Sequence, residues 1–436
     1  MPDFRPLAHF TAVDTWLNDP NGLLHRDGVW HLFFQNNPHG ADWGNMSWGH
    51  ATSTDLLHWE HRPLAISHEG TEAIFSGSAV VHDGRVAAVY TSAYDDGRQA
   101  QSLAWSEDGD TFVKDPANPV LDRASTGFRD PKVFRYGREW RMVSVEADER
   151  TLLVHSSTDL RSWTEVGRFS DEPGTGIWEC PDLFPLDLDG RERWVLLLSV
   201  QDATGSRVEY RVGSFDGSGF SGGPARPFDV GPDVYAVSTW TDAPDGRRVL
   251  IGWMAQPTYA GQTPTAPWRG AMTLPRDLSL TTGDDGEPVL VQLFSPEVRT
   301  AYAEAVTGLP TAALLRCEFS GDATWEFSAG PDVLRLAVRG TDLVVDRSGC
   351  GDVGFHPGFA RTDRVPLPAG TSGFSVFLDR CSIELLAGPL SITQLVFPAE
   401  PLREVRTGGS ARVSVFADRA AEPGRQDDPS RARLAP

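Results

Sequence analysis

Lysine, paired cysteines and long apolar runs are scarce or absent in this chain of 436 residues. Lysine and arginine together number 39, and lysine occurs only at positions 114 and 132. The cysteines form no CxxC pair, and in a chain of this size they do not resemble a disulfide framework; they are Cys180, Cys317, Cys350 and Cys381. No apolar run approaches the roughly 18 residues of a membrane span, so the sequence predicts no transmembrane helix.

A leader segment and a basic surface are also missing. The first residues, MPDFRPLAHF, hold neither the basic stretch nor the apolar stretch of a signal peptide, so we expect a cytoplasmic protein, secreted only if a leader has been removed. The formal net charge is −21, and an acidic surface repels phosphate backbones. We therefore expect no nucleic-acid partner and no membrane partner, whereas a neutral ligand such as a sugar is indifferent to this charge.

Long helical runs rich in Leu, Ala, Glu and Lys are absent as well. Short segments of Val, Leu, Phe, Trp and Tyr alternate instead with clusters of Gly, Asp and Pro, which is typical of all-β proteins. We expect only short helices, such as one around residues 295–306. The length is sufficient for two domains.

One pattern recurs along the first part of the chain: Ser-x-Asp, followed by an aromatic residue four positions after the Asp. The copies begin at intervals of 53, 51 and 57 residues. Each Asp is expected to form a turn between two outer strands, and each aromatic residue to pack between neighbouring sheets. A period near 50 predicts propeller blades of four antiparallel strands, with a fifth blade between residue 231 and about 285. The copies are Ser53/Asp55/Trp59, Ser106/Asp108/Phe112, Ser157/Asp159/Trp163 and Ser214/Asp216/Phe220.

The repeat ends near residue 290, and a different strand pattern follows. The segment VLRLAVRGTDLVVDRSG alternates with period two across a Gly-Thr turn and predicts a hairpin. The segments GFSVFLDRCSIELLAG, ITQLVFP and ARVSVFAD predict further strands. We therefore expect a five-bladed β-propeller catalytic domain over residues 1–290, a β-sandwich over residues 291–418, and a flexible tail over residues 419–436.

Three carboxylates lie early in their predicted blades, where polar side chains point to a common central funnel. Asp19, in WLNDPNG, lies 34 residues before its repeat Ser, and Glu179, in WECPDLF, lies 35 before its own, so we expect these two at equivalent positions. Asp130, in FRDPKVF, lies 27 residues before its repeat Ser. Two carboxylates on either side of a glycosidic bond are the usual equipment for its hydrolysis.

Aromatic and polar residues near these acids complete a candidate sugar site. Flat apolar surfaces for the carbon face of a sugar are expected from Trp16, Trp43, Trp48 and Phe75, and Trp178 is expected to form an apolar wall that raises the pKa of one acid. Hydrogen bonds to hydroxyls are expected from Asn18, Gln35, Ser76 and Arg129. In the fifth blade, Asp233 and Tyr235 are further candidates.

Each motif also has a purely structural interpretation. Asp-Pro-Asn-Gly alone is a turn, and Arg129 beside Asp130 alone is a local ion pair. Cys180 lacks a nearby His to act as its base, so we expect a small buried side chain rather than a nucleophile. His58 and His61 have HxxH spacing but no third ligand in view, so we expect no metal and no cofactor.

Taken together, these stretches resemble the retaining β-fructosidases of glycoside hydrolase family 32, which include invertases, levanases and exo-inulinases. WLNDPNG, FSGS, FRDPKVF and WECPDLF occur in the order and at the spacing of that family. The resemblance covers about residues 6 to 285 well and the second domain weakly. It implies the five-bladed propeller and sandwich fold that the repeat predicts independently.

The resemblance also implies a role for each acid. Asp19 would be the nucleophile, Glu179 the general acid and base, and Asp130 a stabiliser that binds fructose hydroxyls in the transition state. The substrates would be sucrose, fructo-oligosaccharides or fructans with a terminal β-D-fructofuranosyl unit. Retention predicts that the carboxyl groups of Asp19 and Glu179 lie about 5–5.5 Å apart. The residues expected to line the fructosyl pocket are Asn18, Gln35, Trp43, Phe75, Ser76, Arg129 and Tyr235.

One departure from the family pattern affects the pocket wall. Relatives often carry a Trp a few residues after the IGWM strand, where this chain has Pro257, so we expect a wall that is either open or rebuilt, with Trp268 as the candidate for rebuilding it. A fructosyltransferase on the same scaffold and a non-catalytic carbohydrate-binding propeller are the alternatives. The preferred linkage, β-2,1 or β-2,6, and a homo-oligomeric state stay open.

Overall fold

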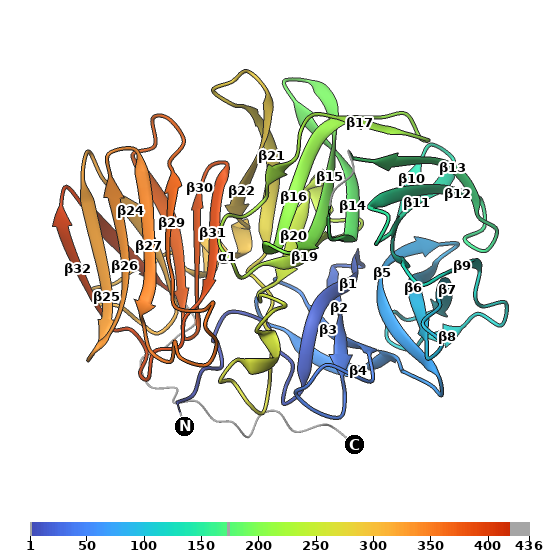
Figure 1. The fold of residues 1–436 in the computed structure, drawn as a ribbon, viewed down its shortest axis with the longest axis horizontal. Helices are drawn as coiled ribbons and strands as arrows, with labels where there is room; N and C mark the ends of the chain where they lie inside the picture. Colours follow the sequence, from blue (N-terminus) through green and yellow to red (C-terminus); the bar gives the residue numbers. More distant parts are fainter. Residues whose placement is uncertain (1, 172–174, 419–436) are drawn as a thin grey trace.

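A computed structural model describes residues 2–171 and 175–418. It confirms the predicted all-β fold, since strands form nearly all of the regular structure (Figure 1). The helix expected around residues 295–306 is present but shorter, as α1 (Pro296–Ala301). Two 3-10 turns, η1 (Pro244–Gly246) and η2 (Ala260–Gln262), complete the helical content of the described ranges. The predicted tail, residues 419–436, lies outside them.

The described chain up to residue 294 forms five successive antiparallel sheets, numbered here 1 to 5 in chain order. Sheet 1 comprises β1 (Trp16–Arg26), β2 (Val29–Asn37), β3 (Ser47–Ser53) and β4 (Glu60–Ile66). Sheet 2 comprises β5 (Glu72–His82), β6 (Arg85–Tyr94), β7 (Gln99–Ser106), β8 (Val113–Lys114) and β9 (Leu121–Ser125). Sheet 3 comprises β10 (Phe128–Tyr136), β11 (Glu139–Glu146), β12 (Thr151–Ser157) and β13 (Thr164–Ser170).

The last two of these sheets continue the pattern. Sheet 4 comprises β14 (Ile177–Leu188), β15 (Arg191–Asp202), β16 (Gly205–Phe215), β17 (Phe220–Gly222) and β18 (Arg226–Pro227). Sheet 5 comprises β19 (Tyr235–Thr239), β20 (Val249–Trp253), β21 (Arg276–Thr282) and β22 (Pro288–Phe294). In each sheet the strands pair in chain order, as in a meander, except that β9 pairs with β7 and β18 pairs with β16.

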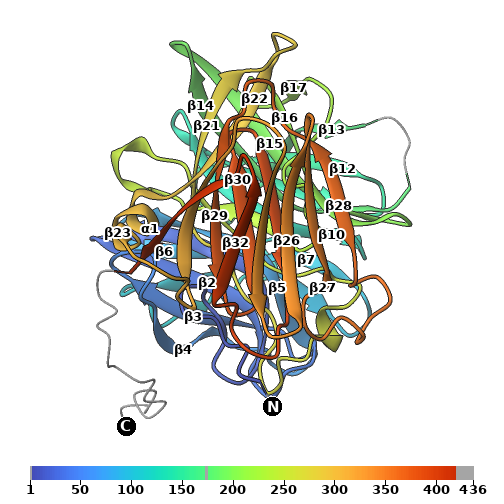
Figure 2. The same cartoon turned by 90° about the vertical axis from the view of Figure 1, so that its left-hand side faces the viewer.

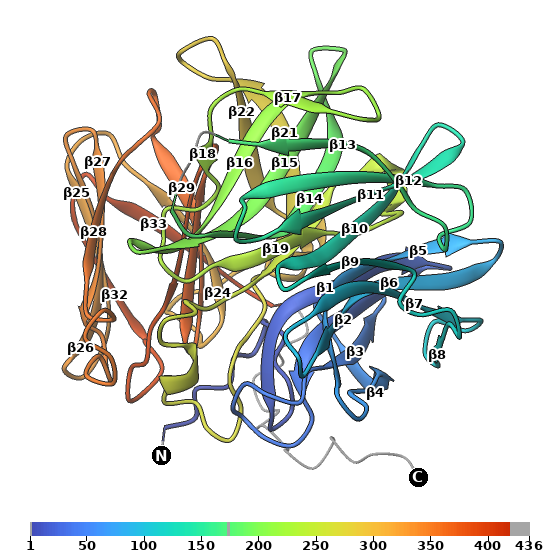
Figure 3. The same cartoon turned by 45° about the vertical axis from the view of Figure 1, so that its right-hand side comes forward.

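The first strand of each sheet lies toward the centre of this part of the molecule (Figures 1 and 3). The strands β1, β5, β10, β14 and β19 each contact the next, and β19 contacts β1. Parallel bridges from Leu24 to Thr241 and from Trp16 to Arg269 also join sheet 1 to the last part of this region. This arrangement is that of a β-propeller, and its five first strands bring distant segments of the chain to one axis.

The Ser-x-Asp repeat forms the predicted turn before the last strand of its sheet. In the first copy, Asp55 accepts the amide N–H bonds of Leu57 at 3.0 Å and of His58 at 2.8 Å. In the fourth copy, Asp216 accepts those of Ser218 at 2.9 Å and of Gly219 at 2.8 Å. The local hydrogen bonding of an Asx turn explains why Asp recurs at this position.

The aromatic residue of the repeat packs against the preceding sheet, as expected. Trp59 stacks on Trp240, which follows β19, with ring centroids 6.3 Å apart. Phe112 of sheet 2 meets Phe33 of sheet 1 edge-on at 5.4 Å. The repeat therefore supplies both a turn and a contact between neighbouring sheets, and the Trp59 contact joins the first sheet to the fifth.

The remaining strands form two layers packed face to face, a β-sandwich (Figure 2). The predicted hairpin is β26 and β27, and both layers contribute to an apolar core around Trp325. One layer comprises β23 (Glu304–Ala305), β24 (Ala313–Glu318), β29 (Gly373–Asp379), β30 (Ser382–Ala387), β31 (Leu390–Leu395) and β33 (Arg412–Ala417). The other comprises β25 (Ala323–Ala329), β26 (Asp332–Arg339), β27 (Asp342–Gly349), β28 (Thr362–Pro366) and β32 (Glu404–Gly409).

A buried ionic network joins the sandwich to the N-terminal segment and to sheet 5. His9 lies between Asp379 and Glu384, with its Nδ1 2.9 Å from one carboxylate and its Nε2 2.8 Å from the other. Glu384 also pairs with Arg276 of β21, and all four side chains are fully buried. Charges removed from water require partners of opposite sign, so this network fixes the two parts against each other.

A second buried pair corrects the prediction that Asp233 points into the central funnel. Asp233 is fully buried and forms an ion pair with Arg347 of the sandwich, and Tyr259 donates a hydrogen bond to the same carboxyl group. Its charge is therefore compensated at the contact between the two parts, away from the funnel.

Candidate active site

The three acids and the seven residues that the family resemblance assigns to the fructosyl pocket all line one pocket of about 520 Å³. The pocket opens where the first strands of sheets 1 to 5 converge, and it also includes residues of the second and third strands. The predicted residues that line it are Asn18, Asp19, Gln35, Trp43, Phe75, Ser76, Arg129, Asp130, Glu179 and Tyr235.

A β-bulge in the first strand of every one of these sheets presents the site residues to the pocket. A bulge inserts an extra residue and re-aims the side chains around it. Asp19, Ser76 and Asp130 lie within bulges. The last paired residues before the five bulges are Leu17, Phe75, Arg129, Glu179 and Tyr235.

The bulges also show that one expectation from spacing is wrong. Asp19 and Glu179 do not occupy equivalent positions of two sheets. Asp19 lies inside the bulge of β1, whereas Glu179 precedes the bulge of β14. Counted from the last paired residue before each bulge, Asp19 lies two residues further along its strand than Glu179, a difference that spacing from the outer repeat could not resolve.

Asp19 is held by neighbours on both of its carboxyl oxygens. Ser76 donates a 2.6 Å hydrogen bond to Oδ2, and the Asn18 amide donates a 3.0 Å bond to Oδ1. The Asn18 side chain is fixed in turn by a 2.7 Å bond from Trp16 Nε1. Burial raises the pKa of Asp19, whereas the bonds from Ser76 and Asn18 favour its ionised form. The arrangement fixes this carboxylate in one orientation.

Asp130 is positioned by its backbone and by its carboxyl group. Its φ angle is 61°, and its Oδ2 accepts a 2.8 Å bond from the backbone N–H of Cys180. Burial is the main cause that raises its pKa to about 7, opposed by the charge of Arg129 and reinforced by that of Glu179. The group therefore changes its protonation near neutral pH.

Glu179 is held by a cation and a phenol. Arg129 Nη2 lies 3.1 Å from its Oε1, and the Tyr235 hydroxyl donates a 2.7 Å bond to its Oε2. Burial and the nearby Glu179 charge raise the pKa of Tyr235 well above its usual range, so the phenol keeps the proton that it donates. Arg129 also donates to Gln99 Oε1 at 3.3 Å, which fixes the guanidinium on its other side.

The aromatic predictions divide into two groups. Trp16, Trp43 and Phe75 line the pocket, and Trp43 is 61% exposed at its rim. Trp48 and Trp178 were expected at the site, and this is wrong, because both are buried in cores between sheets. Successive residues of a strand point to opposite sides, so Glu179 in the pocket directs the adjacent indole into the core.

Several pocket residues were not predicted from the sequence. Gln99 and Gln201 lie near strand ends, where no motif marks them, and Trp253 belongs to the IGWM strand that was assigned only a structural role. Pro257 lines the pocket as expected of the altered wall. Trp268 does not rebuild that wall, because its ring is buried in a separate core under the Arg5 guanidinium.

The thiol of Cys180 lies close to the acids and is not fully buried. Its Sγ is 3.5 Å from Asp19 Oδ2, and burial with the three nearby carboxylates raises its pKa well above the usual range. A protonated thiol is a poor nucleophile, in agreement with the expectation that Cys180 is not one.

The HxxH histidines contact groups other than a common metal position. His58 Nδ1 bonds Asp55 at 2.7 Å, and the ring of His61 packs on Phe10. Each is therefore accounted for by a contact of its own, His58 with the turn before β4 and His61 with the N-terminal segment.

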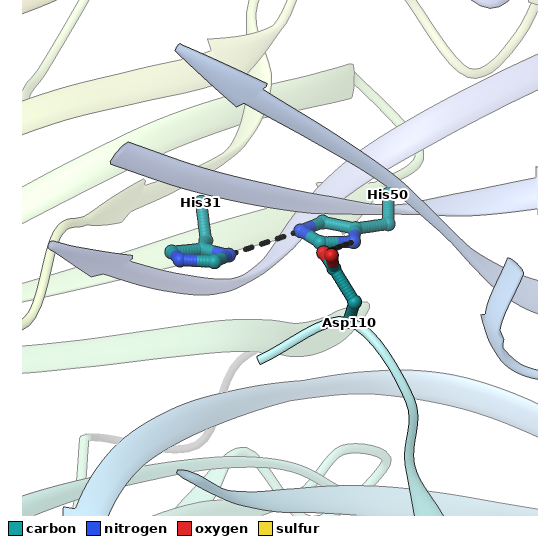
Figure 4. A group of neighbouring side chains, drawn as sticks. All are labelled: His31, His50 and Asp110. Carbon is teal, nitrogen blue, oxygen red and sulfur yellow. Dashed lines mark hydrogen bonds and ion pairs between the residues drawn. The ribbon is translucent and has the colours of Figure 1, made fainter. Parts of the chain in front are cut away.

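A different group, His31, His50 and Asp110, brings metal-ligand types together away from the pocket (Figure 4). His31 Nδ1 and His50 Nε2 face each other at 3.1 Å, whereas Asp110 lies 3.4 Å from the other nitrogen of His50. Asp110 also pairs with Arg62 at 2.5 Å. One ligand atom of each residue lies within 4.8 Å of the others, and the Nδ1 of His50 makes no hydrogen bond within the described ranges. The group is therefore a hydrogen-bonded pair of rings beside a carboxylate that Arg62 neutralises.

Comparison with known proteins supplies the family. Residues 9–292 match the model of the glycosyl hydrolases family 32 N-terminal domain, and residues 337–421 match that of the family 32 C-terminal domain. The chain belongs to glycosyl hydrolase family 32. The two matches cover most of its length, so the resemblance read from the motifs is confirmed.

Individual members of the family are similar over nearly the whole chain. The levanase of Bacillus subtilis is 36% identical over 453 residues, which cover 91% of this chain and 67% of that protein. The extracellular exo-inulinase of Aspergillus niger is 34% identical, covering 93% of this chain and 92% of its own. The crystal structure of exo-inulinase from Aspergillus awamori superimposes with a TM-score of 0.88 at 30% identity, covering 96% of this chain and 98% of that one.

A further solved structure carries a ligand. The fructofuranosidase of Schwanniomyces occidentalis, complexed with fructose, has a TM-score of 0.83 and 27% identity, covering 94% of this chain and 97% of its own. No helix within the described ranges has the length and apolar character needed to cross a membrane.

Proposed function

We propose that this protein is a retaining β-fructofuranosidase that releases terminal β-D-fructofuranosyl units from sucrose, fructo-oligosaccharides or fructans. The observation that carries the proposal is the convergence of Asp19, Asp130 and Glu179 in one pocket with aromatic and hydrogen-bonding walls. The printed names of its relatives, levanase and exo-inulinase, support the same substrate class.

In the proposed mechanism, Asp19 is the nucleophile and Glu179 the general acid. An Asp19 carboxylate oxygen attacks the anomeric carbon of fructose while Glu179 gives its proton to the leaving oxygen, so that the glycosidic bond breaks and a fructosyl ester forms. Glu179 then takes a proton from water, whose oxygen attacks the same carbon and releases both fructose and the Asp19 carboxylate. Two displacements retain the configuration.

The neighbours of the acids support these roles. Ser76 and Asn18 fix the Asp19 carboxylate before attack, which is the preorganisation that a nucleophile needs. Arg129 and Tyr235 donate to Glu179 and would stabilise its ionised form after it has lost its proton. Asp130 would bind fructose hydroxyls and stabilise the positive charge that develops on the sugar. The 5–5.5 Å separation of Asp19 and Glu179 stays a prediction of this mechanism.

We further propose that sheets 1 to 5 are the blades of a closed five-bladed propeller that forms the catalytic domain, residues 1–290. The contact of β19 with β1 and the stacking of Trp59 on Trp240 support closure. The two-layered remainder, residues 291–418, would be a separate sandwich domain.

Replacing the nucleophile tests the function directly. The Asp19→Asn variant keeps the size and shape of the side chain, but it has an NH2 group in place of one acceptor oxygen and cannot form the ester. We expect fructose release from sucrose, kestose, inulin and levan to fall on the order of 10⁴-fold or more, with an unchanged thermal unfolding midpoint. Turnover retained by this variant would refute the mechanism.

Product analysis separates the alternatives. Free fructose as the sole fructosyl product at high sucrose concentration identifies a hydrolase, whereas longer fructosides identify a fructosyltransferase. Saccharide binding without any turnover by the unmodified protein would identify a non-catalytic binding module.

A further inference from the structure

Three residues in the bulges of sheets 3, 4 and 5 adopt a left-handed backbone conformation. The φ angles are 61° for Asp130, 47° for Cys180 and 49° for Ala236. This region of conformational space is sparsely populated by residues other than glycine and is maintained only when surrounding contacts determine it. The contacts that hold these three residues therefore also set the geometry of the site residues beside them.

The backbone N–H of each of these residues is bound by a side chain of the preceding sheet. The acceptor for Asp130 is Thr91 Oγ1 at 2.9 Å, and the acceptor for Ala236 is Ser199 Oγ at 3.0 Å. For Cys180 the acceptor is the carboxylate of Asp130 itself, at 2.8 Å. Hydroxyl groups thus accept the bulge N–H of sheets 3 and 5, and a carboxylate of the site accepts the corresponding N–H of sheet 4.

Thr91 connects the two sides of the pocket that carry Asp19 and Asp130. It lies on β6, is paired with Phe75 and is fully buried. Its hydroxyl lies 3.1 Å from the Ser76 carbonyl oxygen, to which it can donate, and 3.3 Å from Gln101 Oε1. One oxygen therefore links the backbone of the residue that binds Asp19 with the backbone of Asp130.

Ser199 has the corresponding place beside Glu179. It lies on β15, is paired with Glu179 and is fully buried. Its hydroxyl fixes the amide of Ala236, which directly follows Tyr235, and the Tyr235 phenol donates to Glu179. The hydroxyl thus reaches the proposed acid through one residue of the next sheet.

We propose that Thr91 and Ser199 are positioning residues, each of which fixes the bulge of the following sheet. Through these bulges Thr91 orients Asp130 and Asp19, whereas Ser199 orients Tyr235 against Glu179. The inference rests on the proposed function. Neither residue is among the described residues that line the pocket, so each acts through others. Loss of either hydroxyl leaves a buried N–H without an acceptor, which the bulge must relieve by moving.

The two residues are expected to affect different parts of the reaction. Thr91→Val keeps the shape of the side chain without its hydroxyl, and we expect kcat to fall about tenfold or more because small displacements of reacting groups are costly. The loss should be equal for sucrose and for an aryl β-fructofuranoside, since both need the nucleophile. Thr91→Ser, which retains the hydroxyl, should restore kcat to within about threefold.

Ser199→Ala should instead show a dependence on the leaving group. We expect kcat for sucrose to fall about fivefold or more, and kcat for a nitrophenyl β-fructofuranoside to change little, because an acidic phenol leaves without a proton from Glu179. Ser199→Thr should restore the activity on sucrose. Since Ser199→Ala removes a single oxygen, it also keeps the test decisive if Thr91→Val does not fold.

A buried hydroxyl far from the pocket provides the matched control. Ser106 Oγ accepts the Gly109 amide at 2.8 Å in the outer turn of sheet 2, so Ser106→Ala should lower stability and leave kcat unchanged. The inference would be overturned if kcat were equal for Thr91→Val, Thr91→Ser and Ser106→Ala. It would also be overturned if Ser199→Ala lost the same fraction of kcat on both substrates. Failure of the unmodified protein to release fructose would refute the proposed function instead.

Discussion

Because of the His9 network, we expect the stability of this protein to fall as the pH becomes alkaline. Both ring nitrogens of His9 face carboxylates, Asp379 at 2.9 Å and Glu384 at 2.8 Å, so both must carry hydrogen. Burial opposes the charge on the ring, but the two carboxylates outweigh it and raise the pKa of His9 to about 9. The folded protein therefore holds an imidazolium where an unfolded chain at pH 8 holds a neutral ring.

The size and sign of the effect follow from linkage. The difference between the pKa of an unfolded histidine, about 6.5, and the folded value of about 9 corresponds to about 3 kcal/mol of folding free energy. Because the folded pKa is the higher one, this contribution is fully present below pH 6.5 and is lost as the pH rises through 9. The protein should therefore become less stable over this alkaline range.

Urea unfolding of the wild type and of His9→Gln between pH 6 and pH 10 measures this contribution. Glutamine can donate to one carboxylate but does not titrate. We expect the difference in the free energy of unfolding to be largest at pH 6 and to shrink by about 3 kcal/mol by pH 10. A difference that is independent of pH would refute the reasoning, because a purely steric defect has no proton linkage.

Two further predictions concern single hydrogen bonds and buried rings. Ser76→Ala removes a hydrogen bond that favours ionised Asp19, so the pKa of Asp19 should rise. The acid limb of the kcat/KM profile for sucrose should then move up by about one pH unit. A limb that does not move would contradict the contact between Ser76 and Asp19. Burial lowers the pKa of His50 to about 3, so its stabilising contribution is present above pH 6.5 and is lost as the pH falls toward 3. Urea titrations from pH 7 to pH 4 should show a steeper loss of stability for the wild type than for His50→Gln, and equal slopes would contradict a neutral buried ring.

Much of the fold could be predicted because its repeated part is encoded locally. Each Ser-x-Asp copy forms its turn through bonds within a few residues, and its aromatic residue contacts the sheet just before it. The predicted hairpin of the second part likewise depends on a short turn and a period of two. The turns can be read from the sequence because their hydrogen-bonded residues are close together in it, whereas the aromatic contacts, such as Phe112 with Phe33, can be read because they recur at the same place in each copy.

The site could be predicted as a set of residues but not in its geometry. Asp19, Asp130 and Glu179 stand in distinctive motifs, whereas the register of their bulges depends on pairing with strands that no motif marks. The position of Trp178 follows from strand alternation, which directs its indole to the opposite side of the strand from Glu179.

Other misses had no signal in the sequence. Asp233 forms its ion pair with Arg347, which lies more than a hundred residues away in the sequence. Gln99 and Gln201 reach the pocket because the ends of their strands lie beside it. The cytoplasmic location, the oligomeric state and the absence of a cofactor, a metal, a nucleic-acid partner and a membrane partner stay predictions.

The ion pair between Arg276 and Glu384 has a consequence for synthesis on the ribosome. Arg276 belongs to sheet 5, which carries Tyr235 into the pocket, and it pairs with Asp229 and with Glu384, of which Glu384 lies about a hundred residues further along the chain. At common elongation rates that carboxylate emerges on the order of 5 to 20 seconds later. Until then Asp229, which precedes Arg276 in the chain, is the carboxylate available to it, so the buried pairing of this guanidinium is complete only after most of the sandwich has been made.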